Sequence, residues 1–251
     1  MGPEHSIIAA QSLKKEHDGQ LEKEYQDRIE AEMVAAIEKI IAEHFLLGEG
    51  KAGQVFDFPN FSITDLPACI KIIRPELEEL RNKDLIEFRR IQNLSPEEEF
   101  KLQDKLYSEG FRHTPKPLFY GHYGKYQFLI MEKISGYTLK EIIAAKAKLV
   151  NLSWNDLEQL LIKLHRRHGV AHRDLHAGNI MVKTKETLTP DSELSGEQLV
   201  IIDFGLSKRT GGMPTREDYT LTIGKNSIIY PDDRANLEKL TPQKADSPFL
   251  E

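Results

Sequence analysis

One segment carries the strongest signal in the sequence: His172-Arg173-Asp174-Leu175-His176-Ala177-Gly178-Asn179, followed by the strand-like run Ile180-Met181-Val182. An Asp and an Asn five residues apart on a loop suit two tasks. The carboxylate can take a proton from a hydroxyl, and the amide oxygen can bind a divalent cation. Taken alone, the segment could still be an ordinary polar loop.

A second segment strengthens this interpretation. The apolar run Val200-Ile201-Ile202 ends directly in Asp203-Phe204-Gly205. A buried strand that delivers a carboxylate at its end supplies the kind of oxygen ligand that Mg²⁺ prefers. The two motifs occur in this order, each joined to a strand, and together they favour a site that handles phosphates.

Nearer the N-terminus, residues 48–53 read Gly-Glu-Gly-Lys-Ala-Gly and fit the pattern G-x-G-x-x-G. The pattern is weak by itself, because glycine-rich turns are common. A Rossmann fingerprint would continue into a helix, whereas residues 54–59 alternate and predict a strand. Strand, glycine loop and strand would form a flap whose backbone amides can cover nucleotide phosphates, and Val55 follows two residues after the last glycine.

The next predicted strand contains Lys71 within Ala-Cys-Ile-Lys. A lysine flanked by apolar strand residues is costly to bury without an anionic partner, although an edge-strand lysine could also reach solvent. Three consecutive glutamates, Glu97, Glu98 and Glu99, open a predicted helix. We favour Glu99 as the partner of Lys71, with Glu98 as the alternative, because leucines three and seven residues after Glu99 place the apolar face of the helix beside it.

With these motifs in order, residues 45–208 resemble a eukaryotic-type protein kinase catalytic domain in a compact, atypical form. The resemblance implies a two-lobed α+β fold, with an antiparallel β N-lobe, a shortened helical C-lobe and ATP in the cleft. It also implies that ATP and Mg²⁺ are the cofactors. We expect an N-terminal amphipathic helical extension over residues 1–44 and a kinase-like domain over 45–251, divided near residue 132 into an N-lobe (45–132) and a C-lobe (133–251).

The resemblance assigns roles residue by residue. It makes Asp174 the catalytic base, with Lys71 holding the α- and β-phosphates and Glu99 orienting Lys71. It implies the metal ligands Asn179 and Asp203. Arg173 precedes the base, as in protein kinases that pair this arginine with an activation-segment phosphate. Here Glu217 or Asp218 could meet Arg173 as a permanent charge without modification. The alternative is that Arg173 bonds backbone carbonyls of its own loop.

The implied nucleotide contacts come from the glycine loop and from the end of the strand Phe128–Glu132. Met131 would be the gatekeeper, and backbone groups of Glu132 and Ile134 would hydrogen-bond adenine. Plain core packing is the other interpretation of Met131. The residues of the loop implied to contact ATP are Gly48, Glu49, Gly50, Gly53 and Val55.

Two departures from the protein-kinase pattern concern the substrate. His176-Ala177-Gly178 replaces the usual Lys-x-x and is similar to aminoglycoside- and choline-type phosphotransferases. No Ala-Pro-Glu follows Gly205, a truncation similar to that of RIO-type, lipopolysaccharide-kinase-like and bacterial effector kinases. We interpret the chain as an ATP- and Mg²⁺-dependent Ser/Thr protein kinase with a minimal C-lobe. A small-molecule phosphotransferase and a nucleotide-binding pseudokinase scaffold stay open as alternatives.

The composition narrows the remaining possibilities. There are 34 Lys and Arg residues against 40 Asp and Glu, which gives a net charge of −6 and argues against a protein that grips nucleic acid. The single cysteine excludes an internal disulfide and a multi-cysteine zinc site. No apolar run is long enough for a membrane span, and the N-terminus lacks a signal-peptide pattern, so we expect a cytoplasmic protein.

The rest of the pattern predicts the coarse element order. Leu21, Tyr25, Ile29 and Met33 begin an amphipathic stripe that either docks a partner or packs on the following domain. Apolar periodicity predicts helices over 76–93, 96–109 and 138–168, the last interrupted near Asn151, and strands over 118–122, 126–132, 180–182 and 199–202.

Overall fold

The computed structural model describes residues 31, 34–43, 46–49, 53–59, 66–73 and 94–209. In this part the chain forms two compact units. The first unit contains the described residues up to Phe100 together with Pro117–Lys133, and the second contains Lys101–Lys116 together with the described residues from Ile134 onward. The predicted helix over 76–93, most of the N-terminal stripe, and Glu217 and Asp218 lie outside the described residues.

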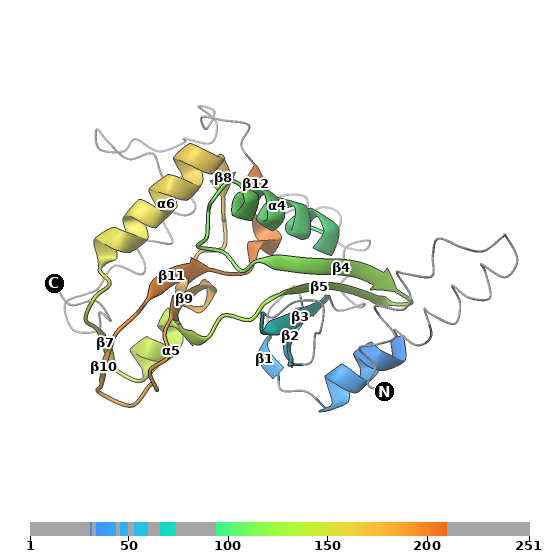
Figure 1. Cartoon of the computed structure of the whole chain (residues 1–251), viewed down its shortest axis with the longest axis horizontal. Helices are drawn as coiled ribbons and strands as arrows, with labels where there is room; N and C mark the ends of the chain where they lie inside the picture. The colour runs from blue at the N-terminus through green and yellow to red at the C-terminus, as the bar shows by residue number, and fades with distance from the viewer. Residues whose placement is uncertain are drawn as a thin grey trace, which may run out of the picture. The chain divides into compact units, whose positions relative to one another are not determined.

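The first unit is built on a five-stranded antiparallel sheet with the order β1-β2-β3-β5-β4 (Figure 1). Its strands are β1 (Leu46–Glu49), β2 (Gly53–Phe58), β3 (Ala68–Ile73), β4 (Pro117–Tyr123) and β5 (Tyr126–Glu132). The sequence predicted each of these strands. Chain neighbours β1, β2 and β3 pair in turn, and β5 lies between β3 and β4, so β3 and β5 are interior strands.

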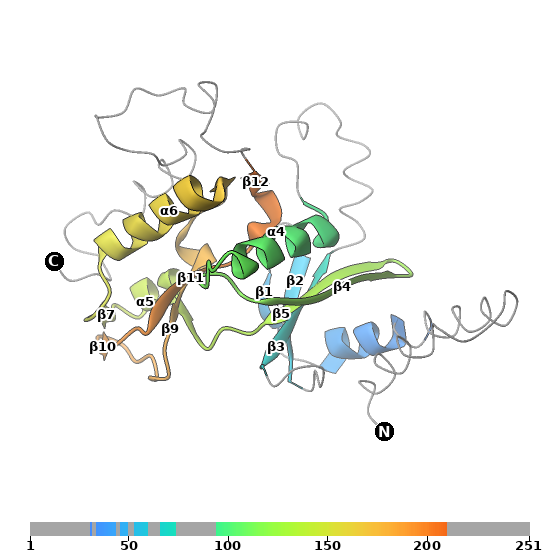
Figure 2. The ribbon, with the colours of Figure 1, turned by 45° about the horizontal axis from the view of Figure 1, so that its top comes forward.

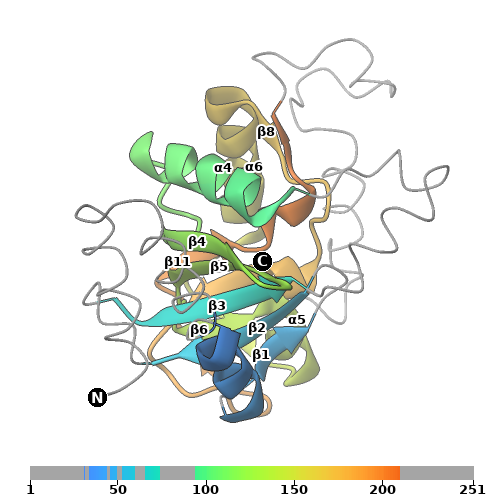
Figure 3. The same ribbon diagram turned by 90° about the vertical axis from the view of Figure 1, so that its right-hand side faces the viewer.

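Alternation along the strands divides the buried residues of this sheet into two clusters. Phe56, Ile70, Ile72 and their neighbours on β5 form the larger one, and Ile37 and Ile40 pack into it. They belong to the helical residues 34–43, which lie beside this sheet in Figure 3. Side chains two apart on a strand share a face, and residues three apart on a helix share a side. This helical segment therefore buries its apolar stripe against the sheet of the same unit.

The described part of the second unit contains the C-terminal part of α4 (Pro96–Ser108), two further helices and three small sheets. The two further helices are α5 (Leu139–Ala144) and α6 (Trp154–His168), with short 3₁₀ turns η2 (Ala177–Asn179) and η3 (Phe204–Leu206). The strands β6 (Gly136–Thr138), β9 (Ile180–Lys183) and β11 (Gln198–Ile201) form one sheet in the order β11-β9-β6. The others are β7 (Lys148–Leu149) with β10 (Glu193–Leu194), and β8 (Val170–Ala171) with β12 (Lys208–Arg209). Figure 2 shows α5 and α6 with these strands.

Helix α4 (Pro96–Ser108) begins where the sequence predicts. Ser95 accepts a hydrogen bond at its Oγ from the Glu98 backbone amide at 3.2 Å, and the Ser95 amide donates to Glu98 Oε2 at 2.8 Å. This reciprocal pair is a capping box, which satisfies two of the backbone donors that a helix start leaves unpaired. No helix in the described part of the chain is long and apolar enough to cross a membrane.

One prediction of secondary structure was wrong. The sequence predicted a helix from Thr138 to near Asn151, but α5 ends at Ala144. Lys146 adopts a left-handed conformation with φ 55°, and the Ala147 amide donates back to the Ile142 carbonyl at 3.1 Å. A Schellman-type ending normally uses glycine, so Lys146 gave no signal in the sequence.

The ends of α4 and α6 are joined by a side-chain hydrogen bond within the second unit. Nδ1 of His168 lies 2.8 Å from Oε2 of Glu109, and the His168 side chain is only 1% exposed. The ring of Phe111 packs edge-on against that of His168 at 5.3 Å. Hydrogen bonding from His168 lowers the pKa of the Glu109 carboxyl below its ordinary value of 4.5.

The pair predicts a pH-dependent contribution to stability. A carboxylate whose folded pKa lies below its unfolded value stabilises the fold above the unfolded value and loses this effect as the pH falls through the folded one. We expect Glu109→Gln to lower the free energy of unfolding at pH 7 by about 0.5 kcal/mol, a modest amount because the carboxylate is partly exposed and screened. The difference from wild type should shrink as the pH falls below 4.5.

Urea unfolding at pH 7 and at successively lower pH measures this difference. Glu197→Gln serves as the control, since Glu197 is exposed, and it should give no pH-dependent difference. A destabilisation by Glu109→Gln that stays constant from pH 7 to pH 3 would show that the charge of Glu109 is not its source.

Candidate active site

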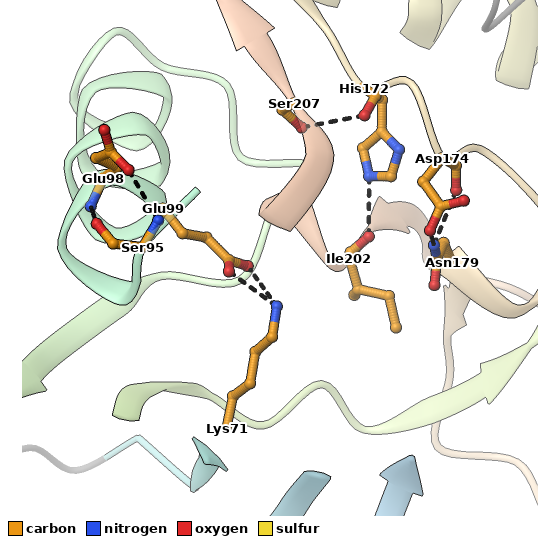
Figure 4. A network of polar contacts seen from close by, with 9 residues as sticks. All are labelled: Lys71, Ser95, Glu98, Glu99, His172, Asp174, Asn179, Ile202 and Ser207. Atoms are coloured by element: carbon orange, nitrogen blue, oxygen red, sulfur yellow. Dashed lines mark hydrogen bonds and ion pairs between the residues drawn. The ribbon is translucent and has the colours of Figure 1, made fainter. Parts of the chain in front are cut away.

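In the first unit, Lys71 and Glu99 form a buried ion pair. Lys71 Nζ lies 2.8 Å from Oε2 and 3.1 Å from Oε1 of Glu99, so the ammonium bridges both carboxylate oxygens (Figure 4). The side chains are 6% and 2% exposed. The strand β3 supplies the lysine and the first turn of α4 supplies the glutamate. A buried charge is tolerated when it is paired in this way, and the pair fixes the direction of the lysine.

The three glutamates that the sequence left in competition have separate partners. Glu97 accepts a hydrogen bond from the hydroxyl of Tyr120 at 3.2 Å, and Glu98 caps the helix through Ser95. Glu99 therefore meets Lys71, as we favoured. The buried leucines three and seven residues later, Leu102 and Leu106, place Glu99 on the inward side of α4.

The glycine-loop residues lie at the ends of two paired strands. Gly48 and Glu49 end β1, and Gly53 begins β2, with Gly48 opposite Val55 in the register. A Cβ on Gly53 would lie 2.3 Å from the carbonyl oxygen of Ile72, so the approach of β2 to β3 requires glycine there. Gly50 and the two residues after it lie outside the described residues.

Val55 and Met131 contribute to a small apolar cluster on one face of the sheet. Its buried members are Cys69, Leu129 and Met131, and Val55 is partly buried against them. Met131 is 6% exposed and thus packs in the unit, which leaves its gatekeeper role a prediction. Glu132 ends β5, and its carbonyl accepts a weak hydrogen bond from the Cys69 thiol at 3.8 Å. The first unit ends at Lys133, and the next residue, Ile134, belongs to the second unit.

Cys69 offers a direct test of this packing. Burial, and secondarily the carboxylate of Asp57, raises the pKa of its thiol to about 12. The thiolate is the reactive form, so we expect iodoacetamide at pH 8 to label the folded protein at least about a hundred-fold more slowly than the urea-unfolded protein. Intact mass reports the reaction cleanly, because the chain has one cysteine. Labelling of the folded protein at the unfolded rate would contradict the burial of this strand.

In the second unit, the segment 172–179 forms a closed loop. The side-chain amide of Asn179 donates from Nδ2 to the backbone carbonyl of Asp174 at 2.8 Å and lies 3.4 Å from Asp174 Oδ2 (Figure 4). Because Nδ2 is engaged in this way, the amide oxygen of Asn179 points elsewhere and keeps its capacity to accept or to ligate. Asn179 is buried, whereas the Asp174 side chain is 41% exposed, as a group that meets a substrate must be.

The antiparallel pairing of β9 and β11 brings the two predicted metal ligands to one end of this sheet. Ile201 lies opposite Ile180, and the Ile202 amide donates to the Asn179 carbonyl at 3.0 Å. Asn179 immediately precedes β9, and Asp203 follows two residues after β11. Asn179 and Asp203 therefore adjoin the same end of the paired strands β9 and β11.

His172 ties the loop to the end of β11, a role that the sequence reasoning did not assign. Its Nε2 donates to the Ile202 carbonyl at 3.0 Å, and the Ser207 hydroxyl donates to the His172 carbonyl at 3.3 Å (Figure 4). The ring is fully buried and stacks edge-on against Phe204 at 5.0 Å. The only signal in the sequence was its place two residues before Asp174.

Two residues of these loops have unusual backbone conformations. Arg173 has φ 69° and Asp203 has φ 61°, both in the left-handed region that residues other than glycine seldom adopt. Such conformations persist only where the surrounding contacts impose them, and they concentrate at functional sites. Here two hydrogen bonds hold both loops: His172 Nε2 donates to the Ile202 carbonyl, and the Ile202 amide donates to the Asn179 carbonyl.

The available oxygen ligands suit Mg²⁺ better than a metal ion whose ligands all come from the protein. Residues 31–209, in their described parts, contain no group of three or more His, Cys, Asp or Glu side chains that could hold a metal ion. Mg²⁺ usually takes only one or two protein oxygens and completes its shell with phosphates and water. The oxygens of Asn179 and Asp203 fit that pattern.

Comparison with known proteins agrees with these arrangements. The model of the ABC1 atypical kinase-like domain matches residues 98–238, more than half of the chain, beginning at the first turn of α4 and including both loops of the second unit. Over 158 residues, or 60% of this chain, the sequence is 27% identical to a serine/threonine-protein kinase of Caenorhabditis elegans. The chain spans only 12% of the length of that protein.

The kinase-like resemblance of the sequence is thereby confirmed, together with a mixed α and β architecture that contains an antiparallel sheet. Similarity to RIO-type or lipopolysaccharide-kinase-like proteins stays a prediction. The matched segment contains Asp174, Asn179 and Asp203, whereas Lys71 and the glycine loop precede it. The chain belongs to the ABC1 atypical kinase-like family.

Proposed function

We propose that the protein is an ATP- and Mg²⁺-dependent phosphotransferase that acts on Ser or Thr hydroxyls of protein substrates. One observation carries the proposal: the β9–β11 pairing brings Asn179 and Asp203 to one edge of a sheet, with Asp174 hydrogen-bonded to Asn179 beside them. Two oxygen ligands and a partly exposed carboxylate are the groups that phosphoryl transfer requires. The kinase name of the nematode relative supports the choice of a protein acceptor.

Five residues of the chain have assigned roles in the proposed reaction. Asp174 accepts the proton of the acceptor hydroxyl while the hydroxyl oxygen forms a bond to the γ-phosphorus and the bond from phosphorus to the bridging oxygen of ADP breaks. Lys71 compensates charge on the α- and β-phosphates, and Glu99 holds the lysine in place. Asn179 and Asp203 would hold Mg²⁺, which supplies further neutralisation of phosphate charge.

The remaining contacts belong to the nucleotide. Backbone amides of Gly48, Glu49, Gly50 and Gly53 would cover the phosphates, as the pairing of β1 with β2 allows. Val55 and Met131 share an apolar cluster that suits the face of a purine. Backbone groups of Glu132 and Ile134 would hydrogen-bond the adenine edge.

A second candidate is a small-molecule phosphotransferase. The observation in its favour is His176, which occupies the place of the usual lysine of Ser/Thr kinases and caps the turn that leads to Asn179. A pseudokinase scaffold is the third candidate, and the presence of Lys71, Asp174, Asn179 and Asp203 weighs against it.

The experiment that separates these functions uses ATP labelled on the γ-phosphate, with Mg²⁺ or with EDTA. The acceptors are a mixture of generic proteins, the protein itself, and a panel of amino sugars and choline. We expect label on Ser or Thr of protein in the presence of Mg²⁺. Label on a small molecule alone would favour the second candidate, and nucleotide binding without any transfer would favour the scaffold.

A further inference from the structure

The side chain of His176 has a fixed orientation in the loop that carries the proposed base. Its Nδ1 accepts a hydrogen bond from the backbone amide of Gly178 at 3.0 Å, which caps the 3₁₀ turn η2. A neutral imidazole carries one proton, so a ring whose Nδ1 accepts must carry that proton on Nε2. The backbone of the loop therefore selects the Nε2–H tautomer of His176.

The nitrogen that carries this proton lies near the proposed base, beyond direct hydrogen-bond distance. Nε2 of His176 lies 3.9 Å from Oδ2 of Asp174, the same oxygen that lies 3.4 Å from Nδ2 of Asn179. Two nitrogens, from the residues two and five positions after Asp174, thus approach one carboxylate oxygen. Within the described residues no hydrogen bond reaches the other oxygen, Oδ1.

Gly178 fixes the ring a second time. A Cβ on Gly178 would lie 3.0 Å from Cε1 and 3.1 Å from Nδ1 of His176, so the imidazole rests directly on the glycine backbone. These separations are shorter than ordinary contacts of a side chain, and a larger residue at 178 would push the ring away. The glycine thus provides both the donor and the room for the ring.

We propose that His176 is a positioning residue for Asp174: the Gly178 amide holds its ring so that Nε2–H lies near Oδ2 and leaves Oδ1 to take the proton of the acceptor hydroxyl. The inference deepens the proposed phosphotransferase and rests on it. A carboxylate held in one rotamer keeps its basic oxygen within reach of the hydroxyl, and loss of such alignment lowers the rate of the chemical step more than the binding of nucleotide.

Two substitutions separate the two functions of the imidazole. In His176→Asn the amide oxygen can take the place of Nδ1 and keep the hydrogen bond to Gly178, but the donor toward Asp174 is lost. In His176→Gln the amide nitrogen reaches the place of Nε2 and keeps that donor, while the cap is lost. We expect His176→Asn to lower kcat about ten-fold with little change in KM for ATP, and His176→Gln to keep kcat within about three-fold of wild type.

The outcomes distinguish the role of His176 from the function itself. Equal losses in both variants, or a kcat of His176→Asn equal to wild type, would overturn the positioning role and leave the phosphotransferase intact. Absence of phosphate transfer in the wild type would remove the function and the role together. His122→Asn is the matched control, because His122 is exposed on β4, and it should leave kcat unchanged.

A second measurement does not depend on the variants. Long-range ¹H–¹⁵N correlation of the imidazole nitrogens reports which one carries the proton, and we expect the Nε2–H tautomer for neutral His176 in the wild type. The Nδ1–H tautomer would be incompatible with acceptance from Gly178 and would overturn the proposal.

Discussion

Replacing Asp174 with Asn is expected to reduce phosphate transfer about a hundred-fold or more and to leave the affinity for ATP nearly unchanged. General-base catalysis contributes a factor of roughly 10² to 10⁴ to the rate, and an amide cannot take the proton of the acceptor. The base acts on the acceptor hydroxyl and not on the nucleotide, so binding of ATP should persist. Initial rates with labelled ATP and a separate nucleotide titration measure the two effects.

The structure makes this substitution a clean one. The hydrogen bond at 2.8 Å that orders the loop runs from Asn179 to the backbone carbonyl of Asp174, which the substitution does not alter. The side chain is 41% exposed, so no buried charge is removed and the melting temperature should hold. Asp104→Asn, at an exposed position of α4, is the control and should have no effect on rate. Retention of more than about a tenth of the wild-type rate would show that Asp174 is not the base.

Asp203→Ala provides the contrasting result at the other loop. Removal of a direct carboxylate ligand should weaken the binding of nucleotide in the presence of Mg²⁺ and have little effect in its absence. The two variants thus divide the site into a group that acts on the acceptor and a group that acts on the metal–nucleotide complex.

Motif order and strand ends are the features from which the sequence predicts candidate site residues. Asp174, Asn179 and Asp203 each adjoin an apolar strand, and the structure shows that antiparallel pairing of β9 and β11 brings the ends of these strands together. Their roles stay predictions. The choice of Glu99 was open, since Glu97 and Glu98 are its direct neighbours. The structure resolves the choice: Tyr120, distant in the chain, hydrogen-bonds Glu97, and Ser95 pairs with Glu98 in the helix cap. Glu99 is the glutamate that binds Lys71.

Other features could not be predicted, because they depend on contacts without a local pattern. The end of α5 at a left-handed Lys146 has no glycine to mark it, and β6 is a strand only because it pairs with β9. The hydrogen bond between Glu109 and His168 joins residues 59 positions apart. Hydrophobic periodicity reports which face of an element is buried, and it contains no information about such single polar partners.

The buried pair of Lys71 and Glu99 leads to the second prediction with a large effect. Removal of one member leaves the other charge buried without this partner, and such changes cost about 3–5 kcal/mol in known cases. We expect Lys71→Met to lower the free energy of unfolding by about 3 kcal/mol and to abolish phosphate transfer. The double variant Lys71→Met/Glu99→Leu replaces the pair by apolar groups and should return to within about 1 kcal/mol of wild type, with phosphate transfer still absent.

This divergence between stability and activity separates a structural ion pair from a functional one. Urea unfolding gives the first quantity and the labelled-ATP assay gives the second. Glu43→Gln is the control, because the pair of Lys39 with Glu43 is 52% and 60% exposed, and its loss should change stability by less than about 0.5 kcal/mol. If the double variant stays as unstable as Lys71→Met, the two charges are not coupled as their 2.8 Å contact requires. If it transfers phosphate at the wild-type rate, Lys71 does not hold the phosphates, and the proposed division of tasks between lysine and base is wrong.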